Sequence, residues 1–481
     1  MTLLHVLCHI SQATCIFAMS SPATTPPPKD PNSERNFRFL QSGTPCEWAE
    51  SYRPGGFHPV HFGDVFKGRY EILRKLGNGS FGTVWLAFDS SYNRYVALKI
   101  EAAKRKDPTE VKIYRILANK VSNDQSSKFV VGLLDYFYHD GPNGNHLCLV
   151  LEPMGPSLSS VLNAPVEIYD PRNPPVRRFR SDKTKSILRH VLSGLNFLHS
   201  NGIVHGDLQS GNILFALQDL NLLDRQILKQ DENDASKIDM LRRIDGKLDR
   251  WAPKYLAVSD PLSYYMLEGQ NQVAKLSDLG GAFCIDDPPL SVLTPASLRA
   301  PEVILNEAIG TGIDIWSFGC IVYELVTGAA LFQLPPFGLS DTEKKDEQLI
   351  QLTDIIGPLP RTLAAKWSNA KKYYDSSGER LDTVPTDIID GFTEDSISDS
   401  RSIDGSSDGV EDADRSRLDL GERVPPQVHE SLEKLVKVHK ASYVGEEEEE
   451  QIVSFLRAIF RYDPLHRPSA GALLDFSWLN T

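Results

Sequence analysis

The hydrophobic periodicity of the chain changes from strand-like to helical, and this change constrains the fold more than any other feature. From about Arg69, the runs RYEILRKLGNGSFGTVWLAFD and RYVALKI alternate β-branched, aromatic and glycine residues around tight turns, as antiparallel strands do. Further on, DKTKSILRHVLSGLNFLHSNG places apolar residues at helical spacing and ends in the stop signal Asn201-Gly202. We therefore expect an α+β chain with a β-rich first part and a helical second part.

The length and charge of the chain narrow the class of protein. With 481 residues and 41% hydrophobic content, it can bury one large two-lobed domain or two ordinary domains. The formal charge of −13 argues against a general nucleic-acid binder, because phosphates would be repelled, and it suits basic partners. The six cysteines form no CxxC pair, which predicts reduced intracellular thiols. We expect a monomer in the cytoplasm, the nucleus or both, with no membrane and no direct nucleic-acid partner.

Two stretches are predicted to lie outside the packed core. Residues 1–36 begin with an interrupted apolar run that no Lys or Arg precedes, so a leader and a disordered tail both remain open. Residues 386–425 contain FTEDSISDSRSIDGSSDGVEDADRSR, whose composition cannot bury enough apolar surface to order the segment. The acidic run GEEEEEQ is expected to be a solvated helix start or a loop.

A glycine-rich turn lies between two of the predicted strands. In GNGSFGTV, Gly77, Gly79 and Gly82 allow a hairpin backbone to close over phosphates without obstruction from Cβ atoms. A strand-like run follows this turn, whereas a dinucleotide-binding fold would place a helix there. Further on, VALK places Lys99 on a strand, where its ammonium group can reach the α- and β-phosphates of a nucleotide.

The segment HGDLQSGNILF spaces polar residues as phosphoryl transfer requires. Asp207 can orient a substrate hydroxyl and accept its proton, while Asn212 can supply an oxygen ligand to Mg²⁺. The run KLSDLGGAF supplies Asp278 as the second metal ligand, with Leu279 as an apolar plug behind it. These residue types at these spacings predict a site that handles phosphate and a divalent cation.

A carboxylate on the first predicted helix offers Lys99 a partner. The run DPTEVKIYRIL places Glu110 before an apolar helix face. The same run also reads as an N-cap at Asp107, a first-turn proline and a capping-box acid at Glu110. An ion pair with Lys99 and a capping role for Glu110 therefore both remain open.

Three later motifs are predicted to hold the helical part together without doing chemistry. They are Glu302 in RAPEVIL, Asp314 in DIWSFGC and Arg467 in DPLHRPSA, with Arg467 as the buried partner of Glu302. Any one of these motifs could arise by chance. The whole set, from the glycine-rich turn to DPLHRPSA, is improbable as a coincidence when the motifs follow one another in this order.

From about Glu47 to the C-terminus, the ordered motifs resemble those of eukaryotic protein kinases. The lead-in ESYRPGGFHPVHFGDVFKGRYEILRKLG, Gly206 inside the HxD motif, DLG in place of DFG, and the insert after the catalytic loop are similar to the SR-protein-specific kinases. Members of that group phosphorylate serine in arginine/serine-rich proteins. The resemblance implies a two-lobed protein kinase fold with a β-rich N-lobe and a helical C-lobe.

The resemblance also implies roles and boundaries. It implies a serine/threonine protein kinase that uses ATP and Mg²⁺, with Asp207 as the catalytic residue, Asn212 and Asp278 as metal ligands, and Arg/Ser-rich proteins as substrates. The residues expected to bind the nucleotide are Leu76, Gly77, Gly79, Gly82, Val84, Ala97, Lys99, Glu110, Glu152 and Met154. The expected segments are an N-terminal extension at 37–69, an N-lobe at 70–154, and a C-lobe at 155–480 with an insert at 216–271.

One position departs from the kinase pattern. Gln209 stands where a Lys normally contacts the γ-phosphate, so the transition state loses one positive charge, although the Gln amide can still donate a hydrogen bond. We expect a slower enzyme; the alternative is a pseudokinase scaffold or binding module without turnover. Asp341, Glu343, Asp346 and Glu347 are candidate docking groups for a basic peptide, with an ordinary helix start as the alternative.

Overall fold

The computed structural model describes residues 37–40, 43–103, 109–118, 125–163, 178–231, 233–234, 236–335, 339–375, 377–381, 384–385, 423–424 and 428–481. The leader or tail predicted at 1–36 lies outside the described residues. So does the acidic loop predicted at 386–425, except for Arg423–Val424.

The chain divides into two compact units, and their limits follow packing instead of chain order. The first unit comprises residues 1–107, 133–153 and 219–262, and the second comprises 108–132, 154–218 and 263–481. Most of the segment expected as an insert in the C-lobe therefore packs with the first unit. The helix α1 (Thr109–Ala118), expected in the N-lobe, belongs to the second unit.

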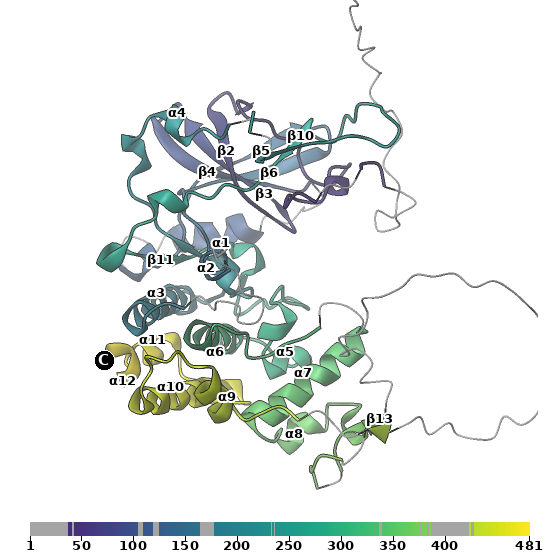
Figure 1. The fold of residues 1–481 in the computed structure, drawn as a ribbon, viewed down its shortest axis with the longest axis vertical. Coiled ribbons are helices and arrows are strands. Elements are labelled where there is room, and N and C mark those ends of the chain that lie inside the picture. The colour runs from purple at the N-terminus through teal and green to yellow at the C-terminus, as the bar shows by residue number, and fades with distance from the viewer. Residues whose placement is uncertain are drawn as a thin grey trace, which may run out of the picture. The chain divides into compact units, whose positions relative to one another are not determined.

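The first unit contains a six-stranded antiparallel sheet in the order β1-β2-β3-β4-β6-β5 (Figure 1). The strand-rich run predicted from Arg69 onward is confirmed, because it forms three consecutive strands of this sheet. A Cβ atom on Gly82 would lie 2.3 Å from the carbonyl oxygen of Ile100, so only glycine fits where these strands approach. The strands are β1 (Val65–Phe66), β2 (Tyr70–Gly79), β3 (Gly82–Asp89), β4 (Arg94–Glu101), β5 (Leu133–Gly141) and β6 (Gly144–Leu151).

Residues 219–262 add a second layer of short elements to this unit. The strands β9 (Ile238–Met240) and β10 (Tyr255–Ala257) form an antiparallel pair, and Ala257 joins the core beneath the sheet together with Trp85. Burying these apolar groups removes them from water, which is the main force that attaches the segment. The segment also contains η6 (Leu220–Leu222) and α4 (Arg225–Leu228).

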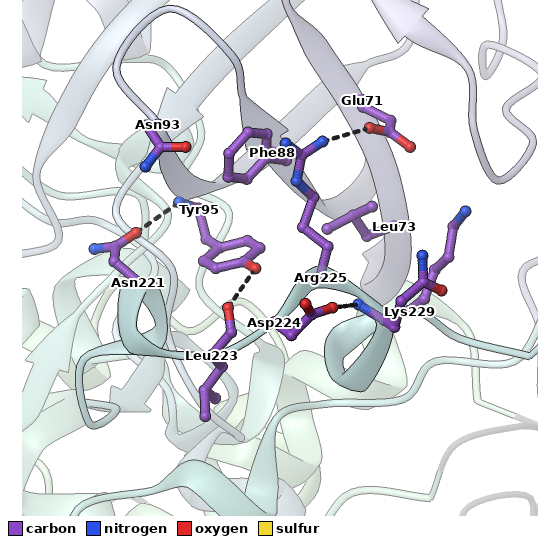
Figure 2. A pocket seen from close by; sticks show the side chains of 11 residues that line it. Glu71, Leu73, Phe88, Asn93, Tyr95, Asn221, Leu223, Asp224, Arg225 and Lys229 are labelled. Carbon is purple, nitrogen blue, oxygen red and sulfur yellow. Dashed lines mark hydrogen bonds and ion pairs between the residues drawn. The ribbon is translucent and has the colours of Figure 1, made fainter.

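A groove of about 440 Å³ lies where the start of this segment meets the sheet, and Figure 2 shows side chains that line it. Tyr95 donates its backbone N–H to Asn221 Oδ1 (3.0 Å) and its hydroxyl to the Leu223 carbonyl (2.9 Å). The guanidinium of Arg225 lies over the Phe88 ring, 3.7 Å from its centroid. The polar and aromatic groups of the groove thus contact one another and hold the segment in place.

The N-terminal extension joins the same unit through a buried polar network. Lys75 on β2 is fully buried, pairs with Glu47 of the extension, and donates to the carbonyl of Ala257 (2.8 Å). The backbone N–H of Lys75 donates to Gln230 Oε1 (3.0 Å). Extension, sheet and insert therefore share one set of hydrogen bonds, and a short 3₁₀ turn, η2 (Ala49–Ser51), lies beside it.

The second unit is mainly helical. The predicted helix is confirmed as α3 (Ser181–Ser200), which buries residues such as Leu188 and Leu192 and ends at Asn201. The helix α6 (Gly312–Thr327) is buried along nearly its whole length. The acidic run starts α10 (Glu446–Ile459), which confirms the expectation of a helix start and places carboxylates at the positive end of the helix dipole.

Short strands, further helices and 3₁₀ turns make up the other described elements of the second unit. Its strands form three antiparallel ladders, which are β7 (Ile203–Val204) with β12 (Phe283–Cys284), β8 (Ile213–Phe215) with β11 (Ala274–Leu276), and β13 (Val384–Pro385) with β14 (Arg423–Val424). Its other helices are α2 (Leu158–Leu162), α5 (Pro301–Ile304), α7 (Asp341–Ile356), α8 (Arg361–Ala364), α9 (Leu432–His439), α11 (Ala470–Leu474) and α12 (Ser477–Asn480). Its 3₁₀ turns are η4 (Gln125–Phe129), η5 (Ser210–Asn212), η7 (Ser263–Tyr265), η8 (Gly269–Asn271), η9 (Leu279–Gly281), η10 (Ala296–Leu298), η11 (Ala370–Lys372) and η13 (Pro464–His466). Among the described residues, no helix combines the length and the apolar character needed to cross a bilayer.

Candidate active site

Two of the short ladders position the loop that carries Asp207. The β7–β12 ladder precedes the loop and the β8–β11 ladder follows it. The backbone N–H of Ser277 donates to the Asn212 carbonyl (2.9 Å), which brings Asn212 beside the strand end that leads into Asp278. Residues separated by more than sixty positions in the chain are thereby placed at one site.

The carboxylate of Asp207 is held by two side-chain amides, one on each oxygen. Gln209 Nε2 donates to Oδ1 (3.0 Å), and Asn212 Nδ2 donates to Oδ2 (3.0 Å). Asn212 Nδ2 also lies 2.8 Å from the Asp207 carbonyl oxygen, to which it donates. Hydrogen bonds to an ionised acceptor are stronger than those between neutral groups, so these contacts fix the side chain in one orientation.

The surroundings of Asp207 favour binding of a proton or a cation. Burial raises the pKa of this carboxyl to about 6, and the nearby charge of Asp278 acts in the same direction. His205 and the amides of Asn212 and Gln209 oppose that rise. A carboxyl whose ionisation is disfavoured by a neighbouring carboxylate is a site where a divalent cation would be stabilised.

The residues present fit a magnesium ion that shares its coordination with phosphates. Because Nδ2 of Asn212 is used toward Asp207, the amide oxygen Oδ1 is the atom left to act as a ligand. Asp278 sits in the left-handed region (φ 59°) at the start of η9, and its Oδ1 accepts the N–H of Gly280 (3.3 Å). The described residues contain no cluster of three or more His, Cys, Asp or Glu able to hold a metal alone. Magnesium is commonly bound by one or two protein oxygens together with nucleotide phosphates, which agrees with this set.

Asp314 anchors the backbone of the catalytic loop from beneath. Its carboxylate accepts the N–H groups of His205 (2.8 Å) and Gly206 (2.9 Å), and His199 Nε2 donates to it (2.8 Å). Burial alone would raise the pKa of Asp314, but the hydrogen bond and charge of His199, followed by His205, hold it below its usual value. The predicted structural role of Asp314 is confirmed by these contacts.

The predicted pair of Glu302 and Arg467 is also confirmed. Arg467 Nη1 and Nη2 donate to the two oxygens of Glu302 at 2.6 and 2.8 Å, and both side chains are buried. A buried bidentate pair of this kind is strongly destabilising to break, because the remaining charge has no partner. It ties the segment after the active site to the C-terminal helices.

The predicted nucleotide-binding residues of the first unit lie on its central strands. Gly77 is opposite Val84 in the β2–β3 register, and Val84 is opposite Lys99 in the β3–β4 register. Ala97 is opposite Leu151 on β6. The other members of the predicted set are Leu76, Gly79 and Gly82 on β2 and β3, Glu152 directly after β6, and Met154, which is buried in the second unit. Their roles in nucleotide binding stay a prediction.

Glu110 is buried in the first turn of α1. Asp107-Pro108, on which the capping alternative depends, lies outside the described residues. The choice between an ion-pair role and a capping role for Glu110 therefore stays open as a prediction.

Two contacts at this site escaped the sequence analysis. Thr294 is buried and its hydroxyl donates to the Gly206 carbonyl (2.7 Å), which holds the segment after DLG against the catalytic loop. The contact of His199 with Asp314 joins positions 115 residues apart. No local spacing could reveal either contact, because the partners come together only through the packing of α3, α6 and the intervening loop.

Most of the acids proposed as docking groups on α7 serve the fold instead. Ser340 and Glu343 form a capping box at the start of the helix. Asp346 is buried and accepts the indole N–H of Trp367 (2.6 Å), while Glu347 pairs with His429 (3.4 Å). The alternative of an ordinary helix start describes this run better than an acidic docking patch.

Comparison with known proteins places this geometry in a family. The model of the protein kinase domain matches residues 70–256 and 265–479. A serine/threonine-protein kinase SRPK of Physarum polycephalum is 33% identical over 350 residues, covering 69% of this chain and 77% of that protein. Protein kinase dsk1 of Schizosaccharomyces pombe is 29% identical over 414 residues, covering 69% and 74%, respectively. Human SRSF protein kinase 3 is 24% identical over 467 residues, covering 69% and 79%.

A solved structure supports the fold independently. The crystal structure of a kinase domain superposes with a TM-score of 0.53 at 24% identity and covers 87% of this chain and 98% of its own. A kinase fold implies ATP, typically a divalent metal, and a protein substrate. The pseudokinase alternative gains no support from these relatives. The chain belongs to the protein kinase family, and within it to the serine/threonine kinases that resemble the SR-protein kinases.

Proposed function

We propose that Asp207 is the catalytic base that directs transfer of the ATP γ-phosphoryl group to a serine of an Arg/Ser-rich protein. The serine oxygen bonds to the γ-phosphorus, the bond from that phosphorus to the departing ADP oxygen breaks, and the hydroxyl proton passes to Asp207. The observation that carries the proposal is the fixed carboxylate of Asp207, with an amide donor on each oxygen and Asp278 nearby.

The other predicted site residues receive supporting roles. Asn212 and Asp278 would hold Mg²⁺, and Lys99 with the glycine-rich turn would hold the nucleotide phosphates. When bound, Mg-ATP supplies the transferred group and a cation that offsets its negative charge. Asp207 orients the substrate hydroxyl, and Asp314 keeps the loop backbone in the conformation that presents Asp207.

The substrate class is supported by the relatives and by charge. Two of the relatives carry the names SRPK and SRSF protein kinase. The net charge of −13 favours encounter with arginine-rich peptides. Of the acids predicted as docking groups on α7, Asp341 is the exposed one, so recognition by that run alone is not part of the proposal.

A peptide panel with the purified full chain tests this proposal. We expect Arg-Ser repeats to be phosphorylated with a higher kcat/KM than proline-directed or acidic peptides. Asp207→Asn should lower kcat by about 10²–10⁴-fold, because the proton acceptor is lost. Gln218→Met, at an exposed position outside the proposed site, is the control for general damage.

Two results would contradict the proposal in different ways. A preference for acidic peptides would exclude the Arg/Ser-rich substrate class while leaving the kinase chemistry intact. Equal turnover by wild type and Asp207→Asn would exclude Asp207 as the base.

A further inference from the structure

The residue that breaks the kinase pattern is in direct contact with the proposed base. Gln209 lies two residues after Asp207, and its Nε2 donates to Asp207 Oδ1 (3.0 Å). This contact gives the Gln209 side chain a role within the loop, in addition to any contact with phosphate.

The two amides act on opposite oxygens of one carboxylate. With Asn212 alone, the carboxylate of Asp207 would be held at one oxygen, and its plane could tilt by partial rotation about the Cβ–Cγ bond. The donor from Gln209 holds the second oxygen as well, so the plane of the carboxylate is fixed at two points. Proton transfer depends on the placement of the accepting oxygen, so restricting this rotation bears directly on turnover.

The backbone places both donors on the same turn. Gln209 is extended (φ −153°, ψ 162°) and precedes the turn η5, whose last residue is Asn212. The backbone N–H of Asn212 donates to the Gln209 carbonyl (2.9 Å), which keeps the backbones of the two residues close together. Both hydrogen bonds to the Asp207 carboxylate therefore form within a stretch of six residues and need no contribution from the insert.

We propose that Gln209 is a positioning residue that, together with Asn212, locks the orientation of the Asp207 carboxylate. This inference rests on the proposed role of Asp207 as base. The requirement at position 209 is then an N–H donor of the right reach, and a positive charge is secondary. Gln209→Met keeps the length and shape of the side chain and removes only the donor and acceptor, whereas Gln209→Lys keeps a donor.

Steady-state kinetics of the full chain with an Arg-Ser peptide test the proposal. Gln209→Met should lower kcat by about tenfold to a hundredfold, as expected for loss of a hydrogen bond to a charged group, while KM for ATP and for peptide stays nearly unchanged. Gln209→Lys should recover most of that loss. Gln218→Met is the matched control, since the same substitution at this exposed position should leave kcat at the wild-type value.

A double-mutant cycle separates positioning from a structural effect. In an Asp207→Asn background, Gln209→Met should change the residual rate by less than about twofold, because its effect acts through the lost base. Thermal unfolding of each variant shows whether it folds, and Gln209→Leu replaces Gln209→Met if the latter does not.

The outcomes also distinguish the two proposals. Wild-type kcat in Gln209→Met, with Asp207→Asn inactive, overturns the positioning role and leaves the base intact. A large rate loss from Gln209→Met in the Asp207→Asn background overturns it as well, since the effect would not pass through Asp207. Full turnover by Asp207→Asn removes the base and the positioning role together.

Discussion

Gly206, between His205 and Asp207, has a backbone conformation that excludes larger residues. Its φ is +71°, and a Cβ atom built on it would lie 2.4 Å from the carbonyl oxygen of Gly281. An alanine would therefore meet both left-handed strain, about 1–2 kcal/mol, and a clash with backbone that cannot move freely.

We expect Gly206→Ala to lower both stability and kcat. The loop must shift to relieve the clash, and it would carry Asp207 with it. Denaturant unfolding and kinase assays measure the two effects, with Gly43→Ala, where nothing lies within 4 Å of the added atom, as the control. Unchanged values for Gly206→Ala would show that the loop tolerates a side chain and that an Arg could be engineered there.

Individual residues also show which contacts can be predicted from the sequence. The pairing of Glu302 with Arg467 was predicted because both lie in motifs with fixed roles. The capping box at Ser340 is readable from spacing alone. The burial of Asp346 is not, because its partner Trp367 follows 21 residues later and binds it only after the chain has turned back. The sequence around a charged residue does not show whether an indole from a distant position will bind it and bury it.

The contact of β2 with the N-terminal extension and with β10 depends on a single side chain. Lys75 is fully buried, and its ammonium group pairs with Glu47 and contacts the Ala257 carbonyl. Lys75→Met should lower the free energy of unfolding by about 3–5 kcal/mol, because Glu47 stays buried without its cation. Equilibrium denaturation monitored by tryptophan fluorescence measures the loss.

The double variant Lys75→Met with Glu47→Gln is the matched comparison. Removing both charges avoids the unpaired carboxylate, so it should recover much of the stability lost in the single variant. A single variant as stable as wild type would mean that water reaches Glu47 and that the extension is only loosely attached.

The helices and strands also differ in how well the sequence predicts them. The hairpins of the sheet and α3 follow from local periodicity, and both were predicted. The attachment of residues 219–262 to the rest of the unit could not be, since it depends on single apolar residues: Leu256 packs against the N-terminal extension and Ala257 against the sheet. Their pattern is too short to show a periodicity, and their partners lie far away in the chain.

For the molecule as a whole, buried histidines make stability dependent on pH. Burial, with the neighbouring His146 and His139, lowers the pKa of His58 to about 3, and burial with Arg189 lowers that of His190 to about 4. The folded protein keeps these rings neutral near pH 5, whereas the unfolded chain protonates them below about pH 6.5. The unfolded state therefore binds more protons, and stability falls as the pH drops through this window.

The expected size of this pH effect on stability can be bounded for the buried ring of His58. His58 contributes up to about 1.4 kcal/mol per pH unit between pH 6 and 4, whereas the half-buried His139 contributes less because solvent screens it. Asp207 acts in the opposite direction, since its raised pKa makes the folded state bind a proton first. Unfolding free energies at pH 7.5 and 5.5 should differ in favour of pH 7.5, and His58→Phe should reduce the difference. Equal stability at the two values would contradict this account.

The network around Lys75 has a consequence for synthesis of the protein. The carbonyl that Lys75 contacts belongs to a residue 182 positions later in the chain. A ribosome that adds about 5–20 residues per second needs roughly 10–40 s to reach it. During that interval the newly made strands of the sheet lack the segment that contains β10. Lys75 and the apolar face of the sheet, which are buried in the folded protein, then have no cover from that segment. Chaperone demand should therefore peak while residues between β2 and β10 are being translated, and it should fall once β10 emerges from the exit tunnel.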